Sequence, residues 1–179
     1  MTQLALPISP RDFLRQVIPA GMALLPKACD SPAARAMLIA IALQESRLAH
    51  RWQVLQGGGK GPARGLLQFE QGTRASRGGV WGVYLHKTSA SLLAPVCRAR
   101  GVALEPRAIW AALETDDVLA VAVARLLLLT DPYPLPARGD AEAGWALYAE
   151  RTWRPGKPHR KPWDGFYAQA WDVVGEGAA

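Results

Sequence analysis

The chain has 179 residues, of which half are apolar and a fifth are charged. This composition supplies enough apolar material for one compact domain and excludes an intrinsically disordered chain. Lysine and arginine outnumber the acids, giving a formal net charge of +6. That charge favours polyanionic partners, of which nucleic acid, an anionic membrane surface and bacterial wall polymers all qualify.

Cysteine and histidine are scarce. The two cysteines, Cys29 and Cys97, are too few for a disulfide framework or a four-sulfur zinc site, and only three histidines accompany them. We therefore expect two buried free thiols, no metal site and no cofactor.

The apolar segments predict neither a secretory signal nor a membrane span. The N-terminus has no basic region and its apolar run breaks at Pro7, while the longest apolar run, residues 118–129, contains Arg125 and is too short for a bilayer. We expect a protein made in the cytoplasm without a signal peptide. If it acts outside the cytoplasm, another component must carry or release it.

Helical patterns dominate the N-terminal part. Residues 10–25 predict a helix that Pro19 interrupts or ends. Residues 31–48 predict a second helix, with Ser31 as its cap and Pro32 at its first position.

The middle of the chain alternates between glycine-rich and helical stretches. Residues 49–65 hold five glycines and a proline and predict a loop. Residues 66–79 predict a short helix or an extended piece, and residues 85–99 and 106–114 predict helices. A strong helix is expected over 116–130, capped by Thr115, with Asp116 and Asp117 serving only the helix dipole. Its apolar residues lie on nearly every side, which is typical of a buried central helix.

A proline-rich connector then leads to a helix over about 140–153, an irregular basic segment over 154–163 and a closing helix over 164–174. No run of alternating strands is evident. We therefore predict one mostly α-helical domain over residues 1–179, built around a buried central helix.

Glu45 is the strongest candidate for chemistry. It lies near the end of the 31–48 helix, on the apolar face and beside the glycine-rich loop. A carboxyl held against apolar surface stays protonated near neutral pH and can act as a general acid. The alternatives are an ion pair with Arg47 or Arg51, or a solvated position at the edge of the apolar face.

Three motifs together resemble those of the goose-type lysozyme and soluble lytic transglycosylase superfamily. Glu45 and Ser46 end a helix; a Gly-x-x-x-Gly-Leu-Leu-Gln segment (61–68) follows, with Thr73 five residues on; and a later Ala-Leu-Tyr segment contains Tyr148. The resemblance covers about residues 31–153. The segments 78–83 and 151–158 are similar to those of a bacteriophage-encoded branch of lysozyme-like proteins.

The resemblance implies a lysozyme-like fold that cleaves the β-1,4 bond between N-acetylmuramic acid and N-acetylglucosamine, with peptidoglycan strands as partner. Glu45 would be the acid, and Tyr148 would orient it. Ser46, Gly65, Gln68 and Thr73 would support the acid or contact the substrate. The family's Asn after the tyrosine is Ala149 here, and the Gly that follows in the family is Arg151, which puts one substrate or cleft contact in doubt.

Glu70 is the best candidate for a second acid, which a hydrolase needs and a lytic transglycosylase does not. The alternative is an exposed charge on a short helix. Four tryptophans in or beside loops could stack on sugars, although a place in the core is the simpler interpretation for each: Trp52, Trp81, Trp153 and Trp163.

These observations favour a wall-degrading lytic transglycosylase, with a hydrolytic muramidase next. A different class is an inactive lysozyme-like domain that binds wall or forms part of a virion. A nucleic-acid binder fits the charge, but the chain shows no recognised nucleic-acid motif. We expect a monomer, either free or carried in a phage particle.

Overall fold

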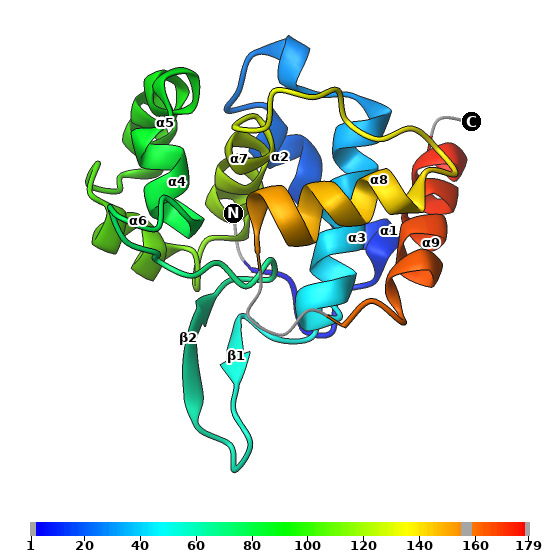
Figure 1. Ribbon diagram of the computed structural model, residues 1–179. Coiled ribbons are helices and arrows are strands. Elements are labelled where there is room, and N and C mark those ends of the chain that lie inside the picture. Colours follow the sequence, from blue (N-terminus) through cyan, green and yellow to red (C-terminus); the bar gives the residue numbers. More distant parts are fainter. Residues whose placement is uncertain (1–2, 155–158, 178–179) are drawn as a thin grey trace.

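The computed structural model describes residues 3–154 and 159–177, and in this part helices predominate over one small antiparallel sheet (Figure 1). The elements in chain order are α1 (Pro10–Asp12), η1 (Phe13–Val17), α2 (Ile18–Met22), η2 (Lys27–Cys29), α3 (Pro32–Ser46), β1 (Trp52–Val54), β2 (Lys60–Arg64), α4 (Gly79–Leu85), α5 (Lys87–Arg100), α6 (Pro106–Ala112), α7 (Asp117–Leu128), α8 (Ala141–Trp145), η3 (Ala146–Thr152) and α9 (Trp163–Glu176). The prediction of a mostly α-helical chain is confirmed.

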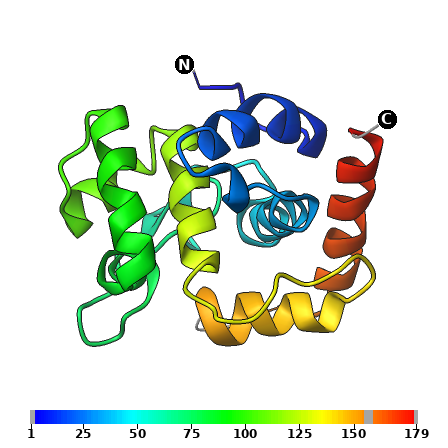
Figure 2. The ribbon, with the colours of Figure 1, turned by 90° about the horizontal axis from the view of Figure 1, so that it is seen from above.

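Helix α3 lies in the middle of a group formed by α2, α7, α8 and α9, and is seen end-on from above (Figure 2). Its start follows the sequence signals, because the Ser31 hydroxyl accepts a hydrogen bond from Ala34 N–H and Pro32 occupies the first turn. It ends where Arg47 and Leu48 both adopt positive φ, at 55° and 56°. This left-handed pair turns the chain sharply away just after Glu45.

Helix α7 is buried along its whole length, as its apolar pattern predicts. It lies between α3 and the group formed by α4, α5 and α6 (Figure 2). The predicted cap was one residue too early, because Asp116 rather than Thr115 accepts the hydrogen bond from Leu119 N–H. A carboxylate at this position also interacts favourably with the helix dipole, so Asp116 is the stronger cap.

The first helical region continues through Pro19 to Met22, so the prediction that Pro19 interrupts or ends it was wrong. The reason is the π-helical segment η1 before it. Ile18 N–H donates to the carbonyl of Phe13, five residues back. Pro19, the next residue, has no N–H to donate, and the helix tolerates it at this change from π-helical to α-helical geometry.

The predicted loop over 49–65 is largely a β-hairpin, which extends away from the helices (Figure 1). Strands β1 and β2 pair Trp52 with Arg64 and Val54 with Lys60. Three of the glycines that suggested a loop form the tip, where Gly57 and Gly58 have φ of 92° and 85°, whereas Gly61 lies within β2 and Gly65 follows it. The strands are short, so the alternation of buried and exposed residues along them was hard to recognise among the glycines.

The segment 66–78 contains turns and an isolated bridge between Arg64 and Phe69, and no helix. Helix α4 then begins at Gly79, where the sequence suggested an end. Gly79 has φ of 56°, and a side chain there would overlap the Glu70 carbonyl. Glycine is thus required by a close backbone contact that also brings Glu70 beside α4.

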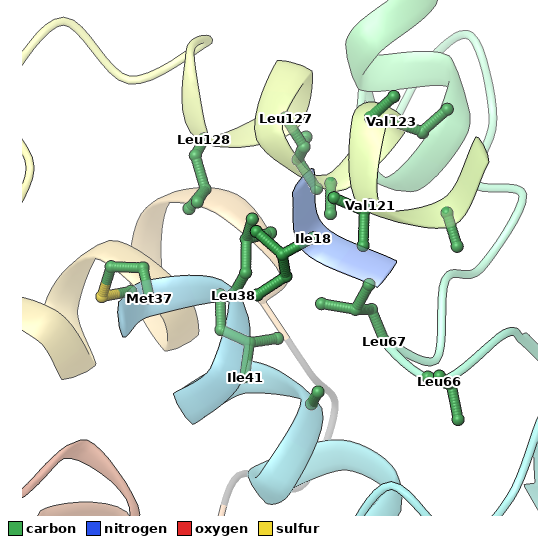
Figure 3. Close-up of a cluster of buried hydrophobic side chains, with 14 of the residues drawn as sticks. Ile18, Met37, Leu38, Ile41, Leu66, Leu67, Val121, Val123, Leu127 and Leu128 are labelled. Carbon is green, nitrogen blue, oxygen red and sulfur yellow. The ribbon is translucent and has the colours of Figure 1, made fainter. Parts of the chain in front are cut away.

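The core joins α2, α3, α7 and the segment after the hairpin. Figure 3 shows Leu38 and Ile41 of α3 facing Val121 and Leu127 of α7, with Leu67 beside them. Burial of this apolar surface is the main source of stability. Cys29 and Cys97 are both buried and free, as expected.

Arg51 and Asp117 form a buried ion pair, with Arg51 Nη2 2.7 Å from Asp117 Oδ2 and both side chains less than a tenth exposed. Asp117 therefore does more than complement the helix dipole, and that prediction was wrong. Arg51 also donates to the Leu4 carbonyl, while Gly65 N–H donates to the Arg51 carbonyl. The pair ties the base of the hairpin to the start of α7.

No helix within the described residues combines the length and apolarity that crossing a bilayer requires.

Candidate active site

A cleft of about 910 Å³ opens between the hairpin, the end of α3, the turn region before α4 and η3. Its residues come from segments far apart in the chain, and several are those singled out in the sequence. They are Gln44, Glu45, Gln53, Ala63, Gln68, Phe69, Glu70, Gly72, Ser76, Gly78, Gly79, Leu127, Tyr148, Trp153, Arg154 and His159.

Glu45 lies in this cleft with most of its surface covered. The pKa of its carboxyl is raised to about 7, chiefly by burial; the hydrogen bond from Tyr148 opposes the rise and the charge of Glu70 contributes to it. Near neutral pH a large fraction of Glu45 is therefore protonated, which is the state that a general acid requires.

Neither alternative for Glu45 fits this geometry. Arg51 is paired with Asp117 instead, and the guanidinium of Arg47 lies over the Phe166 ring at 4.1 Å. Glu45 accepts a hydrogen bond from the Tyr148 phenol, and within residues 3–154 and 159–177 it forms no ion pair.

Tyr148 donates a hydrogen bond to Glu45 Oε1 at 2.8 Å. Burial and the neighbouring carboxylate both raise the pKa of Tyr148 far above its usual value, so it remains a neutral donor. Its ring stacks on the buried indole of Trp163, with ring centres 5.1 Å apart and planes 7° apart. The sequence placed Tyr148 on an α-helix, whereas it lies in the π-helical segment η3.

Replacing Tyr148 by Phe removes the donor and leaves the ring. Because that hydrogen bond stabilises the charged form of Glu45, its loss should raise the pKa of Glu45 further. The alkaline limb of a pH–activity profile should move to higher pH, and activity should fall by about tenfold or more as the acid loses its orientation. An unchanged alkaline limb would mean that Tyr148 does not control this proton.

Ser46 does not reach the cleft, although the resemblance implied a role beside Glu45. Its hydroxyl is buried, donates to the Leu66 carbonyl at 2.6 Å and accepts from Leu48 N–H at 3.1 Å. Ser46 is therefore absent from the residues that line the cleft. It fixes the end of α3, and so Glu45, to the segment after the hairpin.

Gly65 and Gln68 lie in the turn after β2, and of the two only Gln68 is among the residues that line the cleft. Gly65 has φ of 74°, and a side chain there would come within 2.7 Å of the Leu113 carbonyl, so only glycine allows this approach. Gln68 also has positive φ, and its Nε2 donates to the Gly65 carbonyl at 2.8 Å. Gln68 lines the cleft, as the resemblance implied, while its amide also closes the turn.

Thr73 is exposed and is absent from the residues that line the cleft. Its hydroxyl accepts from Ser76 N–H, and its own N–H donates to Ser76 Oγ. This reciprocal pair caps a surface turn, so the geometry gives Thr73 a local structural role and does not support substrate contact.

Glu70 is exposed and lines the same cleft as Glu45. It lies outside any helix, in the segment before α4. The alternative of an exposed charge on a short helix was therefore wrong about the helix. Its exposed side chain in the cleft is compatible with each of the two interpretations that the sequence left, a second acid and an exposed charge.

Of the four tryptophans near predicted loops, only Trp153 lines the cleft. Its Nε1 donates to the Leu67 carbonyl at 3.0 Å, and its ring packs against Phe69. Trp163 is fully buried and begins α9, which confirms the core interpretation for that residue. Trp52 lies exposed on β1 beneath the Lys60 ammonium, and Trp81 lies in α4.

Sequence reasoning missed several residues that line the cleft, chiefly Gln53, Arg154 and His159. Gln53 belongs to β1, and the strand alternation Trp-Gln-Val would have placed it opposite its exposed neighbours. A side chain on Gly61 would overlap the Gln53 carboxamide, so that glycine leaves room for it. Arg154 and His159 belong to the basic segment predicted to be irregular, residues 154–163. Residues 159–162 form no helix or strand, as predicted, and α9 begins at Trp163, whereas residues 155–158 lie outside the described part.

Among the described residues, no three His, Cys, Asp or Glu side chains come together as metal ligands would. The chemistry that these residues themselves offer is that of one protonated carboxyl group held by a phenol in a cleft of sugar size. In comparisons with known proteins, no family model, no curated protein and no solved structure matches this chain.

Proposed function

We propose that the protein is a lysozyme-like enzyme that degrades peptidoglycan by cleaving the β-1,4 bond between N-acetylmuramic acid and N-acetylglucosamine. The observation that carries this proposal is Glu45, buried at the cleft, bonded by Tyr148 and with its pKa raised to about 7. The cleft volume of about 910 Å³ suits several sugar rings. The residues that carry the resemblance to the lytic transglycosylase superfamily supply the substrate class.

In this proposal Glu45 donates its proton to the glycosidic oxygen as positive charge develops on the sugar ring. The carboxylate that remains accepts the proton of the muramyl 6-hydroxyl, whose oxygen bonds to the anomeric carbon. The product ends in a 1,6-anhydro sugar, and Glu45 returns to its protonated form. One carboxyl group thus serves as acid and then as base.

Hydrolysis is the second candidate function, favoured by Glu70 in the same cleft. Glu70 would activate a water molecule while Glu45 protonates the leaving group. The two reactions give different products, because a hydrolytic end retains the elements of the water that was added.

Mass spectrometry of the fragments released from purified peptidoglycan separates these reactions. We expect fragments lighter by one water than the reducing products, and we expect the Glu70→Gln variant to release them too. Reducing products that disappear in Glu70→Gln would establish the hydrolase. An absence of cleavage products under all conditions would favour the third class, a lysozyme-like wall-binding or virion structural protein.

A further inference from the structure

Arg154 brings a positive charge to the wall of the cleft. Its backbone N–H bonds to the carbonyl of Tyr148, the residue whose phenol holds Glu45, and its Nη2 donates to the Ser76 carbonyl at 3.2 Å. The guanidinium also lies close over Gly78, where a side chain would come within 3.2 Å of it. The cation therefore has a defined place beside the turn before α4.

Within residues 3–154 and 159–177, Arg154 makes no ion pair with a carboxylate. Its neighbours in the chain differ in this respect, because Arg151 pairs with Asp131, and Arg160 pairs with Glu142 and Asp164. The bond to Ser76 uses one donor of the guanidinium, so further donors remain for a ligand in the cleft.

A neutral sugar chain gives such a cation little to bind. Hydroxyl and acetamido groups carry no charge, whereas the peptide stems that peptidoglycan bears on its muramyl residues carry free carboxylates. Arginine binds a carboxylate through two parallel hydrogen bonds, which are stronger than bonds between neutral groups. The anion must be attached to the same strand that occupies the cleft, because the cation and Glu45 line one cavity.

We propose that Arg154 binds a carboxylate of the peptide stem and makes the protein selective for stem-bearing glycan over bare glycan. This inference rests on the proposed function for the identity of the strand. It adds a specificity-determining residue that acts on the stem and leaves the bond-breaking chemistry to Glu45.

Binding to the Glu45→Gln protein tests the inference without requiring turnover. The probes are two soluble glycan fragments of equal length, and binding is measured by isothermal titration calorimetry. One carries uncrosslinked peptide stems. The other has had its stems removed by an amidase and the lactyl carboxylates that this exposes converted to neutral methylamides, so that it carries no carboxylate. We expect the stem-bearing fragment to bind about tenfold more tightly at low salt. Adding Arg154→Gln should remove that preference and leave binding of the bare fragment unchanged, while Arg154→Lys should retain part of it.

Arg98→Gln is the matched control, because Arg98 is an exposed arginine on α5 that does not line the cleft. Rising salt should reduce the preference of the protein that retains Arg154 towards the level of Arg154→Gln, which shows none. If Arg154→Gln lost equal affinity for both fragments, the inference would be overturned, since Arg154 would then act on the sugar or the turn. It would also be overturned if Arg154→Gln lost no affinity for either fragment. If neither fragment binds and the wild-type protein cleaves no peptidoglycan, the proposed function itself fails.

Discussion

The Glu45→Gln variant should lose cleavage of purified peptidoglycan by a factor of about 10²–10⁴, the range that a general acid contributes. Glutamine keeps the shape of the side chain, and its oxygen can still accept the hydrogen bond from Tyr148. It has no proton to donate to the glycosidic oxygen. The loss should therefore appear in kcat, with little change in binding, and can be followed as clearing of a wall suspension.

Glu150→Gln is the matched control for this experiment, because Glu150 is an exposed glutamate on η3 that does not line the cleft. It should clear the suspension at the wild-type rate. Equal rates for wild type and Glu45→Gln would remove Glu45 from the mechanism, whatever its pKa.

The Glu45→Gln variant should also be more stable than the wild-type protein at pH 8. In the folded state the pKa of Glu45 is about 7, against an ordinary value of 4.5. Below pH 4.5 the carboxyl is protonated in both the folded and the unfolded chain. Between pH 4.5 and 7 the unfolded chain releases the proton first, so folding stability falls as pH rises through this window.

The rise in this pKa corresponds to about 3 kcal/mol of unfolding free energy lost from the wild-type protein across that window. Glutamine carries no charge, so the unfolding free energy of Glu45→Gln should not fall in this way. Its stability relative to the wild-type protein should therefore increase as pH rises. Urea unfolding of both proteins at pH 4 and pH 8 measures the difference. A constant difference between the two proteins at both pH values would show that burial does not disfavour the charged form of Glu45.

The sequence predicted the helices that have clear boundary signals and an apolar face. Helix α3 begins at Ser31 and Pro32 as expected, and α7 is buried along its length, because caps and periodicity are local properties of the chain. Glu45 was identifiable for the same reason: a carboxyl on an apolar helix face is a local anomaly.

Features that depend on contacts between distant segments could not be predicted in this way. The bond between Tyr148 and Glu45 was expected only through the family resemblance, since 103 residues separate them. No local sequence pattern predicts the π-helical segments or the ion pair between Arg51 and Asp117. The hairpin was hidden because glycines that form its tip also predict loops.

Ser46 illustrates a different limit. A motif states which residue types recur together, but it does not distinguish a residue that touches the substrate from one that holds the backbone. Ser46 bonds Leu66 and Leu48 and never reaches the cleft. Its contribution to the site is to place Glu45, a role that becomes visible only from the hydrogen bonds on both sides of the hairpin.

Titration of the Glu45 side-chain carboxyl by carbon-detected NMR, assigned by comparison with Glu45→Gln, is the most direct measure of whether this chain keeps an acid ready for proton transfer. We expect its chemical shift to change with a midpoint near pH 7. A midpoint close to 4.5, the ordinary value for a solvated glutamate, would contradict the account, because the group would then hold almost no proton at neutral pH.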